Sequence, residues 1–331
     1  MNKKSFLPTA IAALALLTSS FLALGTGPVN ISFIKILQAL LGHHSLTPQE
    51  TTVLFDLRLP RIMLGALVGL ALATSGSVFQ TVFRNPLADP YLLGAASGAG
   101  LGATLAFITA RGDVYGWLPI FAFLGSASAV ALTFVLAGKF FADPATLLLS
   151  GIAIGSFTTA VQTFLQQRHS DLHRPVYNWI LGELTSADWR TVMWSAIYIG
   201  VALITLLAIS DKLDALYIGD DEAFSLGVSV KNVRLIAIGA ATLATATAVA
   251  ASGLIGFVGI VVPHIVRGLT HSASNQLLLA IGLSGSAFLV LADLGARTLL
   301  SPAELPIGVI TALVGAPFFI AVLRSRKISH A

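Results

Sequence analysis

The chain has 331 residues, of which 56% are apolar and only 10% are charged, whereas a soluble domain carries about 25% charged residues. So few charges cannot cover a water-exposed surface. Together with a mean hydropathy of +0.87, the composition excludes a solvated globular enzyme and a disordered chain, and indicates a protein surrounded mainly by lipid. The absence of cysteine excludes disulfides, thiol nucleophiles and cysteine-ligated metals. The net charge of +4 gives no indication of nucleic acid as a partner.

The N-terminal segment shares some features with a signal peptide. A basic start ending at Lys4 precedes an apolar run from Phe6 to Leu24, and Ala23-Leu24-Gly25 loosely resembles a cleavage site. The apolar run is long enough to cross a bilayer, and further apolar runs follow it. We therefore interpret it as an uncleaved first transmembrane helix.

Hydrophobic runs separated by polar residues, proline or glycine predict about ten membrane spans. They lie at 6–25, 61–82, 91–109, 117–140, 145–167, 190–209, 233–251, 257–270, 277–295 and 305–323. The segment 257–270 is short and contains Pro263, which removes one helical hydrogen bond. A tolerated kink and a segment that lines a transport pathway both explain this proline.

An even number of spans places both termini on one side of the membrane. Eleven lysines and arginines fall on that side and eight on the other, so the positive-inside rule favours cytoplasmic termini. Glycines four residues apart, such as Gly65 with Gly69 and Gly94 with Gly98, allow helices to approach closely in lipid. We expect an all-α polytopic protein, with residues 1–331 forming one compact transmembrane domain.

The sequence offers little support for an enzyme. Gly282-Leu283-Ser284-Gly285 matches the nucleophile motif of intramembrane serine proteases, but the one histidine that follows it is His330 in the C-terminal tail. His264 and His271 have no carboxylate between them, and neither an HExxH nor a Walker motif is present. We expect packing or capping roles for these residues, and no ATP hydrolysis by this chain itself.

A secondary transporter or a channel is the alternative class of function. A secondary transporter needs ionisable residues within the membrane for coupling. The candidates all fall near the predicted outer face: Glu183, Asp188, Asp293 and Glu304. A channel needs a ring of polar filter residues, and the sequence shows none.

Two predicted cytoplasmic loops stand out. The first, Arg84–Pro90, has two prolines four residues apart that stiffen it, and Asn85 and Asp89 can cap the next helix. The second, Tyr217–Gly227, is the longest cytoplasmic loop and contains three consecutive acidic residues from Asp220 to Glu222, which favour a short helix from Asp220 to Leu226. The exposed apolar side of such a helix either docks on another protein or packs on the chain's own loops.

Several long motifs occur in order along nearly the whole chain. They are RLPR at Arg58–Arg61, RNPLADPYLLG ending at Gly94, LLLSG at Leu147–Gly151, YIGDDEAFSLG at Tyr217–Gly227, GLIGFVGIVVPHIVR at Gly253–Arg267, ADLGAR ending at Arg297 and ELPIGVITALVGAPFF at Glu304–Phe319. With these motifs the chain resembles the FecCD-type permease subunits of bacterial type II ABC importers, which move iron–siderophores, haem or cobalamin.

The resemblance implies a multi-pass protein of the bacterial cytoplasmic membrane that works by alternating access. It implies a homodimer, two ATP-binding subunits on the cytoplasmic side and a substrate-binding protein outside. ATP and Mg²⁺ belong to the partner subunits, and this chain itself carries no cofactor. The substrate is a metal chelate, for which an iron–siderophore is our first expectation and haem or cobalamin the alternatives.

The resemblance also assigns residues. The ATPase-coupling segment comprises Gly219, Asp220, Asp221, Glu222, Ala223, Phe224, Ser225, Leu226 and Gly227, and the cytoplasmic gate comprises Asn85, Pro86 and Leu87. A second gate element of the family can carry serine or threonine, whereas Asp143-Pro144-Ala145 has no hydroxyl before Thr146. Arg58, Arg61 and Arg297 match arginines that meet glutamates of the binding protein. The alternative for these three is a charged head that snorkels from a helix end.

Overall fold

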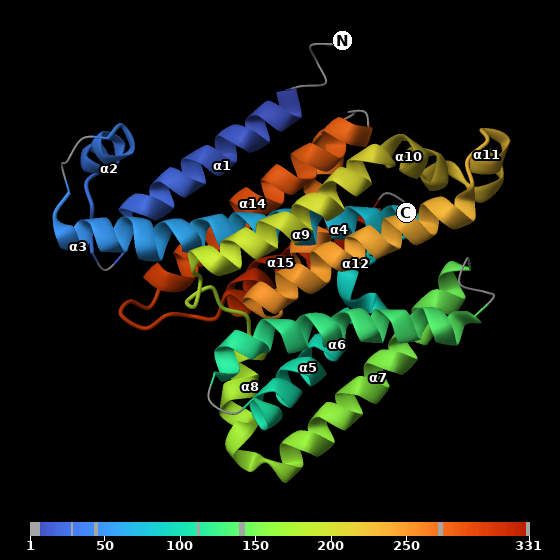
Figure 1. Ribbon diagram of the computed structural model, residues 1–331. Helices are drawn as coiled ribbons and strands as arrows, with labels where there is room; N and C mark the ends of the chain where they lie inside the picture. Colours follow the sequence, from blue (N-terminus) through green and yellow to red (C-terminus); the bar gives the residue numbers. More distant parts are fainter. Residues whose placement is uncertain are drawn as a thin grey trace.

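The structure is a computed structural model that describes residues 7–27, 29–42, 46–110, 113–138, 143–270 and 274–328. Within these ranges all regular secondary structure is helical (Figure 1). The all-helical class expected from the sequence is confirmed.

The predicted spans all correspond to helices. Seven helical segments are long and apolar enough to cross a membrane, and three shorter apolar helices accompany them. The long ones are α1 (Leu7–Gly25), Pro48–Val82 ending in α4 (Leu59–Val82), α6 (Val114–Ala137), α7 (Pro144–Arg168), α9 (Trp189–Ala208), α12 (Val230–Ser252) and α14 (Ser274–Thr298). The others are α5 (Ala95–Thr109), α13 (Val258–Leu269) and the apolar part Ile307–Val322 of α15 (Ile307–Ile328).

The sequence analysis missed several short helices, because they are too short to stand out in a hydropathy pattern. They are α2 (Phe33–Leu40), α8 (His173–Ile180), α10 (Ser210–Ile218) and the 3₁₀ turns η3 (Pro90–Leu93) and η5 (Ser170–Leu172). The second span also starts earlier than predicted, with α3 (Pro48–Thr51) and the π-helical stretch η2 (Thr52–Arg58). Its start is defined by a capping box in which Thr47 and Glu50 bond each other's backbone.

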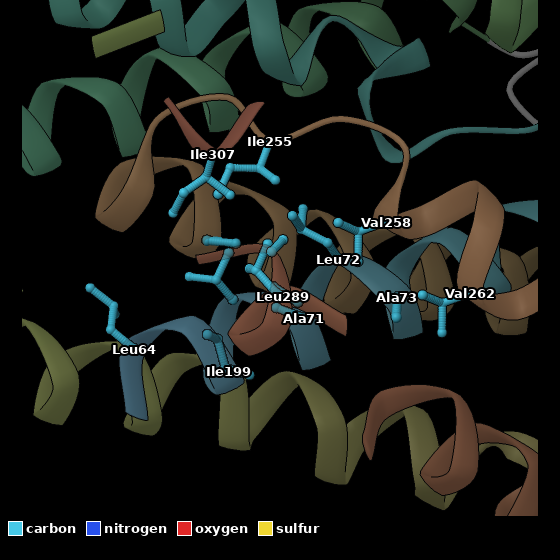
Figure 2. Packing of buried hydrophobic residues seen from close by; sticks show 14 of the residues in the cluster. Leu64, Ala71, Leu72, Ala73, Ile199, Ile255, Val258, Val262, Leu289 and Ile307 are labelled. Carbon is cyan, nitrogen blue, oxygen red and sulfur yellow. The ribbon is translucent and has the colours of Figure 1, made fainter. Parts of the chain in front are cut away.

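Helix α4 lies at the centre of the larger group of helices and contacts α14, α12, α13 and α9 (Figure 1). Figure 2 shows the core around it, where Leu64 and Leu72 of α4 pack with Ile199 of α9 and Leu289 of α14. A second group, α5, α6 and α7, lies to one side and joins the first through contacts of α12 with α6 and α5. The buried core therefore runs along α4.

Small residues allow these helices to approach closely. A Cβ at Gly69 of α4 would collide with the backbone of Gly285 on α14. Gly98 of α5 meets Gly125 of α6 in the same way. The packing role that the sequence analysis expected for the four-residue glycine spacings is confirmed at Gly69 and Gly98.

The GLSG motif belongs to the same packing surface. Gly282 faces Leu70 and Thr74 of α4, and Gly285 faces Gly69 and Ala73.

The histidines considered as metal ligands give no metal-site geometry. The ring of His264 packs edge-on against Phe318 at 5.8 Å between centroids, while His271 and His330 lie outside the described residues. The described part of the chain contains no group of three or more metal-ligating side chains. The contacts of Gly282, Gly285 and His264 favour packing roles for these residues.

Candidate functional site

The candidate residues gather at two opposite ends of the molecule. Helices α2 and α3 lie at one end, and α10 and the short helix α11 (Asp220–Ser225) lie at the other (Figure 1). We call the first the α2 end and the second the α11 end. The proposed docking arginines lie at the α2 end, and the proposed gate and coupling residues lie at the α11 end.

The coupling segment forms the short helix that its acidic start predicts. Helix α11 ends one residue before the predicted end, with Leu226 as its C-cap. Gly227 adopts a left-handed conformation with φ of 76°, and its amide bonds the carbonyl of Phe224 at 2.9 Å. Glycine at this position ends the helix without a Cβ penalty. Tyr217 and Ile218, which the sequence analysis placed in this loop, instead finish α10.

Helix α11 buries one face and exposes another. Ala223 is fully buried, whereas Phe224 is 78% exposed and Leu226 is 69% exposed. The alternative that Phe224 packs on this chain's own loops is therefore wrong. Two large apolar side chains project from a short, anchored helix, which is an unusual arrangement unless a further surface covers them.

Asp220 anchors the start of α11 through two arginines from distant parts of the chain. Its carboxylate lies 2.8 Å from Nη2 of Arg84 and 3.0 Å from Nη2 of Arg234. Arg84 follows α4, and Arg234 lies on α12 with only 2% of its side chain exposed. We call these three residues the Asp220 clamp. The sequence analysis missed it, because nothing in a single sequence pairs residues 136 positions apart.

The proposed gate turn begins directly after Arg84. Arg84 has a left-handed backbone with φ of 46°, which is uncommon for a residue with a Cβ. The amide of Asn85 donates to the carbonyl of Gln80 at 3.1 Å, and the Asn85 side chain accepts from the amide of Leu87 at 3.0 Å. Asn85 thus closes its own turn and does not cap the next helix, while Leu87 stays 39% exposed.

Asp89 performs the capping that the sequence predicts. Its carboxylate accepts from the amide of Tyr91 at 2.8 Å at the start of η3. Burial raises the pKa of Asp89 to about 6, although the hydrogen bond from the Tyr91 amide acts in the opposite direction. The Tyr91 hydroxyl in turn bonds the carbonyl of Ile255 at 3.1 Å. The loop after α4 is thereby fixed to the stretch before α13.

The stretch proposed as a second gate element is also well ordered by local bonds. The Asp143 carboxylate accepts from the Thr146 hydroxyl at 2.6 Å and from the Thr146 amide at 2.9 Å. The hydroxyl, followed by the amide, lowers the pKa of Asp143. Asp143 therefore caps α7, and the Thr146 hydroxyl, whose late position stands out in the sequence, holds the capping carboxylate in place.

A hydrogen-bond network around Arg267 joins α13 to α4 close to the gate turn. Arg267 donates to the Gln80 side chain at 2.8 Å and to the Ser77 hydroxyl at 2.8 Å. The side-chain amide of Gln80 in turn donates to the carbonyl of Gly259 at 3.0 Å. The sequence analysis did not single out Gln80 or Arg267 for this role. Each is a strongly polar residue in an otherwise apolar segment, and this is the signal that could have found them.

Arg61 is the centre of a charge network at the α2 end, and its side chain is 13% exposed. Its Nη2 lies 2.8 Å from a carboxylate oxygen of Asp293 and 2.9 Å from one of Glu304. Nη1 also reaches Glu304, at 3.2 Å, so the pair is bidentate. Two of the carboxylates considered for ion coupling, Asp293 and Glu304, are thus paired with this arginine.

Arg58 and Arg297 lie in the interior, which corrects the expectation that their guanidinium groups face outward. Each is only 5% exposed. Arg58 donates to the carbonyls of Leu24 and Val29, and Arg297 donates to that of Ala23. The last carbonyls of α1 lack helical partners, and cations are favourable at a helix C-terminus. These two arginines therefore cap α1, and from this position they do not reach a docked protein.

An apolar cavity of about 620 Å³ lies against one face of α15. The lining side chains come from the end of α8, the non-helical stretch before α13, and α15 itself. They include Ile180, Leu254, Phe257, Val309 and Leu313. No charged residue lines this cavity, so it lacks the groups that would hold a polar ligand tightly.

The chain is similar to known transport proteins over most of its length. A profile of the FecCD transport family matches residues 15–325. The chain is 41% identical over 273 residues to the cobalamin import system permease protein of Halobacterium salinarum, covering 82% of this chain and 73% of that protein. It is 34% identical over 324 residues to the Fe(3+)-citrate import system permease protein of Bacillus subtilis, covering 98% and 96%.

A solved structure shows the same fold. It is an ABC transporter assigned to the metal-chelate type in an inward-facing conformation, with a TM-score of 0.86 and 30% sequence identity, and the match covers 96% of this chain and 98% of that one. The family match spans nearly the full chain and the helices superpose over the same length. The chain is a multi-pass membrane protein that belongs to the FecCD transport family.

Proposed function

We propose that this chain is the membrane-spanning permease of an ATP-driven importer that carries a metal chelate into the cytoplasm. The observation that carries the proposal is α11, a short helix anchored at Asp220 with Phe224 and Leu226 exposed. It provides an apolar docking surface at one end, while a charge network lies at the opposite end. The resemblance to FecCD-type permeases implies a homodimer with a binding protein outside and two ATP-binding subunits inside as its partners.

Helix α11 is the proposed contact with the ATP-binding subunit. Phe224 fits an apolar groove because aromatic anchors contribute strongly to interfaces. ATP and Mg²⁺ bind in the partner subunits, whose approach displaces α11. The displacement opens the pathway to one side of the membrane at a time, as alternating access requires. The Asn85–Leu87 turn is the proposed cytoplasmic gate.

The α2 end is the proposed docking surface for the binding protein. Arg61 contributes its guanidinium, on a side chain that is 13% exposed, and Glu304 beside it is 38% exposed. Arg58 and Arg297 contribute indirectly, by holding the end of α1 beneath that surface. Rim charges of this kind chiefly raise the association rate and set the orientation of the complex.

An iron–siderophore is our first choice of substrate. Relatives named for iron citrate and for cobalamin both align over most of the chain, and haem remains a further alternative from the resemblance. The cobalamin relative has the higher identity of the two, which makes cobalamin the second candidate. The apolar cavity suits a large chelate that must be released, because a site with tight polar contacts would hinder release.

Transport by the purified complex tests the proposal. The chain is co-expressed with an ATP-binding subunit from the same organism, reconstituted in vesicles, and supplied with binding protein and radiolabelled iron–siderophore, haem or cobalamin. We expect co-purification of the ATP-binding subunit and ATP-dependent uptake of one chelate. Uptake that is driven by a proton gradient, without an ATP-binding subunit, would identify a secondary transporter instead.

A further inference from the structure

We propose that the Asp220 clamp is the mechanical link between α11 and the gate turn, with Arg84 as its releasable arm and Arg234 as its fixed arm. The inference rests on the proposed function, because it takes α11 as the coupling element and Asn85–Leu87 as the gate. It adds a positioning role for Arg84 and Arg234, to which the sequence assigned none.

The two arms of the clamp differ in exposure, and this difference decides which of them can open. In the Arg84 pair both side chains are 39% exposed, so water competes for the contact and the pair is weak. Arg234 is 2% exposed and reaches both carboxylate oxygens of Asp220, at 3.0 and 3.1 Å. Breaking a contact of this kind at a buried charge costs more than breaking an exposed one. Movement of α11 therefore breaks the Arg84 contact before the Arg234 contact.

Arg84 is well placed to pass a displacement to the gate. It precedes Asn85 directly, so loss of its side-chain contact acts one residue from the turn. Its left-handed backbone is a conformation that this residue adopts only when its surroundings hold it there. Release of the Asp220 contact removes one of the interactions that hold it.

The interactions that remain after the Arg84 contact is lost define which part of the chain can move. The amide of Asn85 is held by the carbonyl of Gln80, and the Gln80 side chain is held by Arg267. Gln80 also bonds Gly259 at the start of α13. The turn can thus swing about the end of α4, while α4 and α13 stay tied together. The opposite arm, Arg234, also acts on Asp143 at the start of α7 through its charge.

The test uses the full complex with its ATP-binding subunits in vesicles. Arg84→Gln removes the charge, Arg84→Lys keeps it, and Asp220→Asn removes the shared partner. The matched control is Lys212→Gln, an exposed lysine on α10 for which the described part of the chain shows no ion pair. The native chain has no cysteine, so Leu87→Cys provides one reporter thiol in the permease, and its maleimide labelling is read by mass with and without nucleotide.

We expect Arg84→Gln to lower the substrate taken up per ATP hydrolysed by roughly fivefold or more, the lower range of measured coupling effects. Nucleotide should no longer change the labelling rate of the cysteine at position 87 in this variant. Arg84→Lys should restore most of both signals, and Lys212→Gln should change neither. Asp220→Asn should lower the coupling ratio and also the melting temperature, because it weakens a charged contact of the buried Arg234.

Two outcomes separate this inference from the function on which it rests. If nucleotide changes the labelling rate in the parent complex and the same change persists in Arg84→Gln with an unaltered coupling ratio, the link through Arg84 is wrong while the gate stands. If the parent complex transports substrate but its labelling rate does not respond to nucleotide, the Asn85–Leu87 gate itself is wrong, and the link falls with it.

Discussion

Arg58 gives a prediction about stability, because its guanidinium completes the C-terminus of α1. Arg58→Met keeps the length of the side chain but leaves the carbonyls of Leu24 and Val29 without their donors. A buried acceptor that loses its partner costs about 1–3 kcal/mol. We expect a lower melting temperature of the permease in detergent. The control Arg190→Met, at an exposed position on α9, should leave it nearly unchanged, and equal melting temperatures would contradict the capping role.

Asp89 gives a prediction about pH. Its pKa is raised from 3.8 to about 6 by burial, so between these values the folded state binds more protons than the unfolded state. The contribution of Asp89 to stability is therefore present at low pH, falls as pH rises through about 6, and stays lost above it. Asp89→Asn removes this ionisation and keeps an acceptor for the Tyr91 amide.

The measurement compares melting temperatures of the Asp89→Asn variant and the parent between pH 4 and 8. We expect the variant to be the more stable at pH 7.5, by at most about 3 kcal/mol, and the difference to vanish near pH 4. A difference that does not depend on pH would show that the carboxylate is already charged at low pH and that its burial is without consequence.

At the scale of elements, the crossing of α4 and α14 depends on the absence of a side chain. A Cβ at Gly69 would collide with the backbone of Gly285, so Gly69→Ala forces the helices apart. Overpacking of this kind costs about 1–3 kcal/mol. Gly239→Ala on α12 is the matched control, because nothing lies within 4 Å of the added Cβ, and alanine there should stabilise the helix by about 0.5–1 kcal/mol. Thermal unfolding that fails to separate these two variants would contradict the tight crossing.

Helix α11 gives the second prediction at this scale. Phe224→Ala removes a side chain that is 78% exposed, so we expect no change in the melting temperature of the isolated permease. If Phe224 anchors the ATP-binding subunit, truncation should weaken association by ~2 kcal/mol or more, about thirtyfold in the dissociation constant. The stoichiometry after purification and a binding titration measure this. Tyr115→Ala, exposed at the start of α6, is the control, and normal assembly of Phe224→Ala would refute the anchor.

For the whole molecule, the orientation can be tested with single cysteines. Leu300→Cys lies in the loop before α15 and Lys212→Cys lies on α10, both at exposed positions. We expect a membrane-impermeant maleimide to label the first from outside intact cells and the second only in inverted vesicles. Labelling of both residues from the same side would contradict the odd number of crossings between them, namely α12, α13 and α14, and the assigned orientation.

The sequence predicts the helices well and their contacts poorly, for physical reasons. The ten spans are readable because lipid demands long apolar runs, and α11 because charge and a following glycine define a helix end. The pairs that organise both ends join residues far apart, 136 positions for Arg84 with Asp220 and 243 for Arg61 with Glu304. No local rule links such residues. For the same reason Arg58 and Arg297 look exposed in the sequence, although the folded chain uses them to close α1.

The shortness of α13 has a consequence for biogenesis. Its 12 residues rise about 18 Å at 1.5 Å per residue, well short of a hydrocarbon core about 30 Å thick. Such a segment cannot enter the bilayer as an independent span during synthesis, because the backbone groups outside the helix would meet lipid without partners. The stretch before α13 finds its hydrogen-bond partners on earlier helices, as Ile255 does with the Tyr91 hydroxyl. These partners are already synthesised when α13 leaves the ribosome. We infer that α13 enters the membrane as a hairpin with α14, against helices that were inserted earlier.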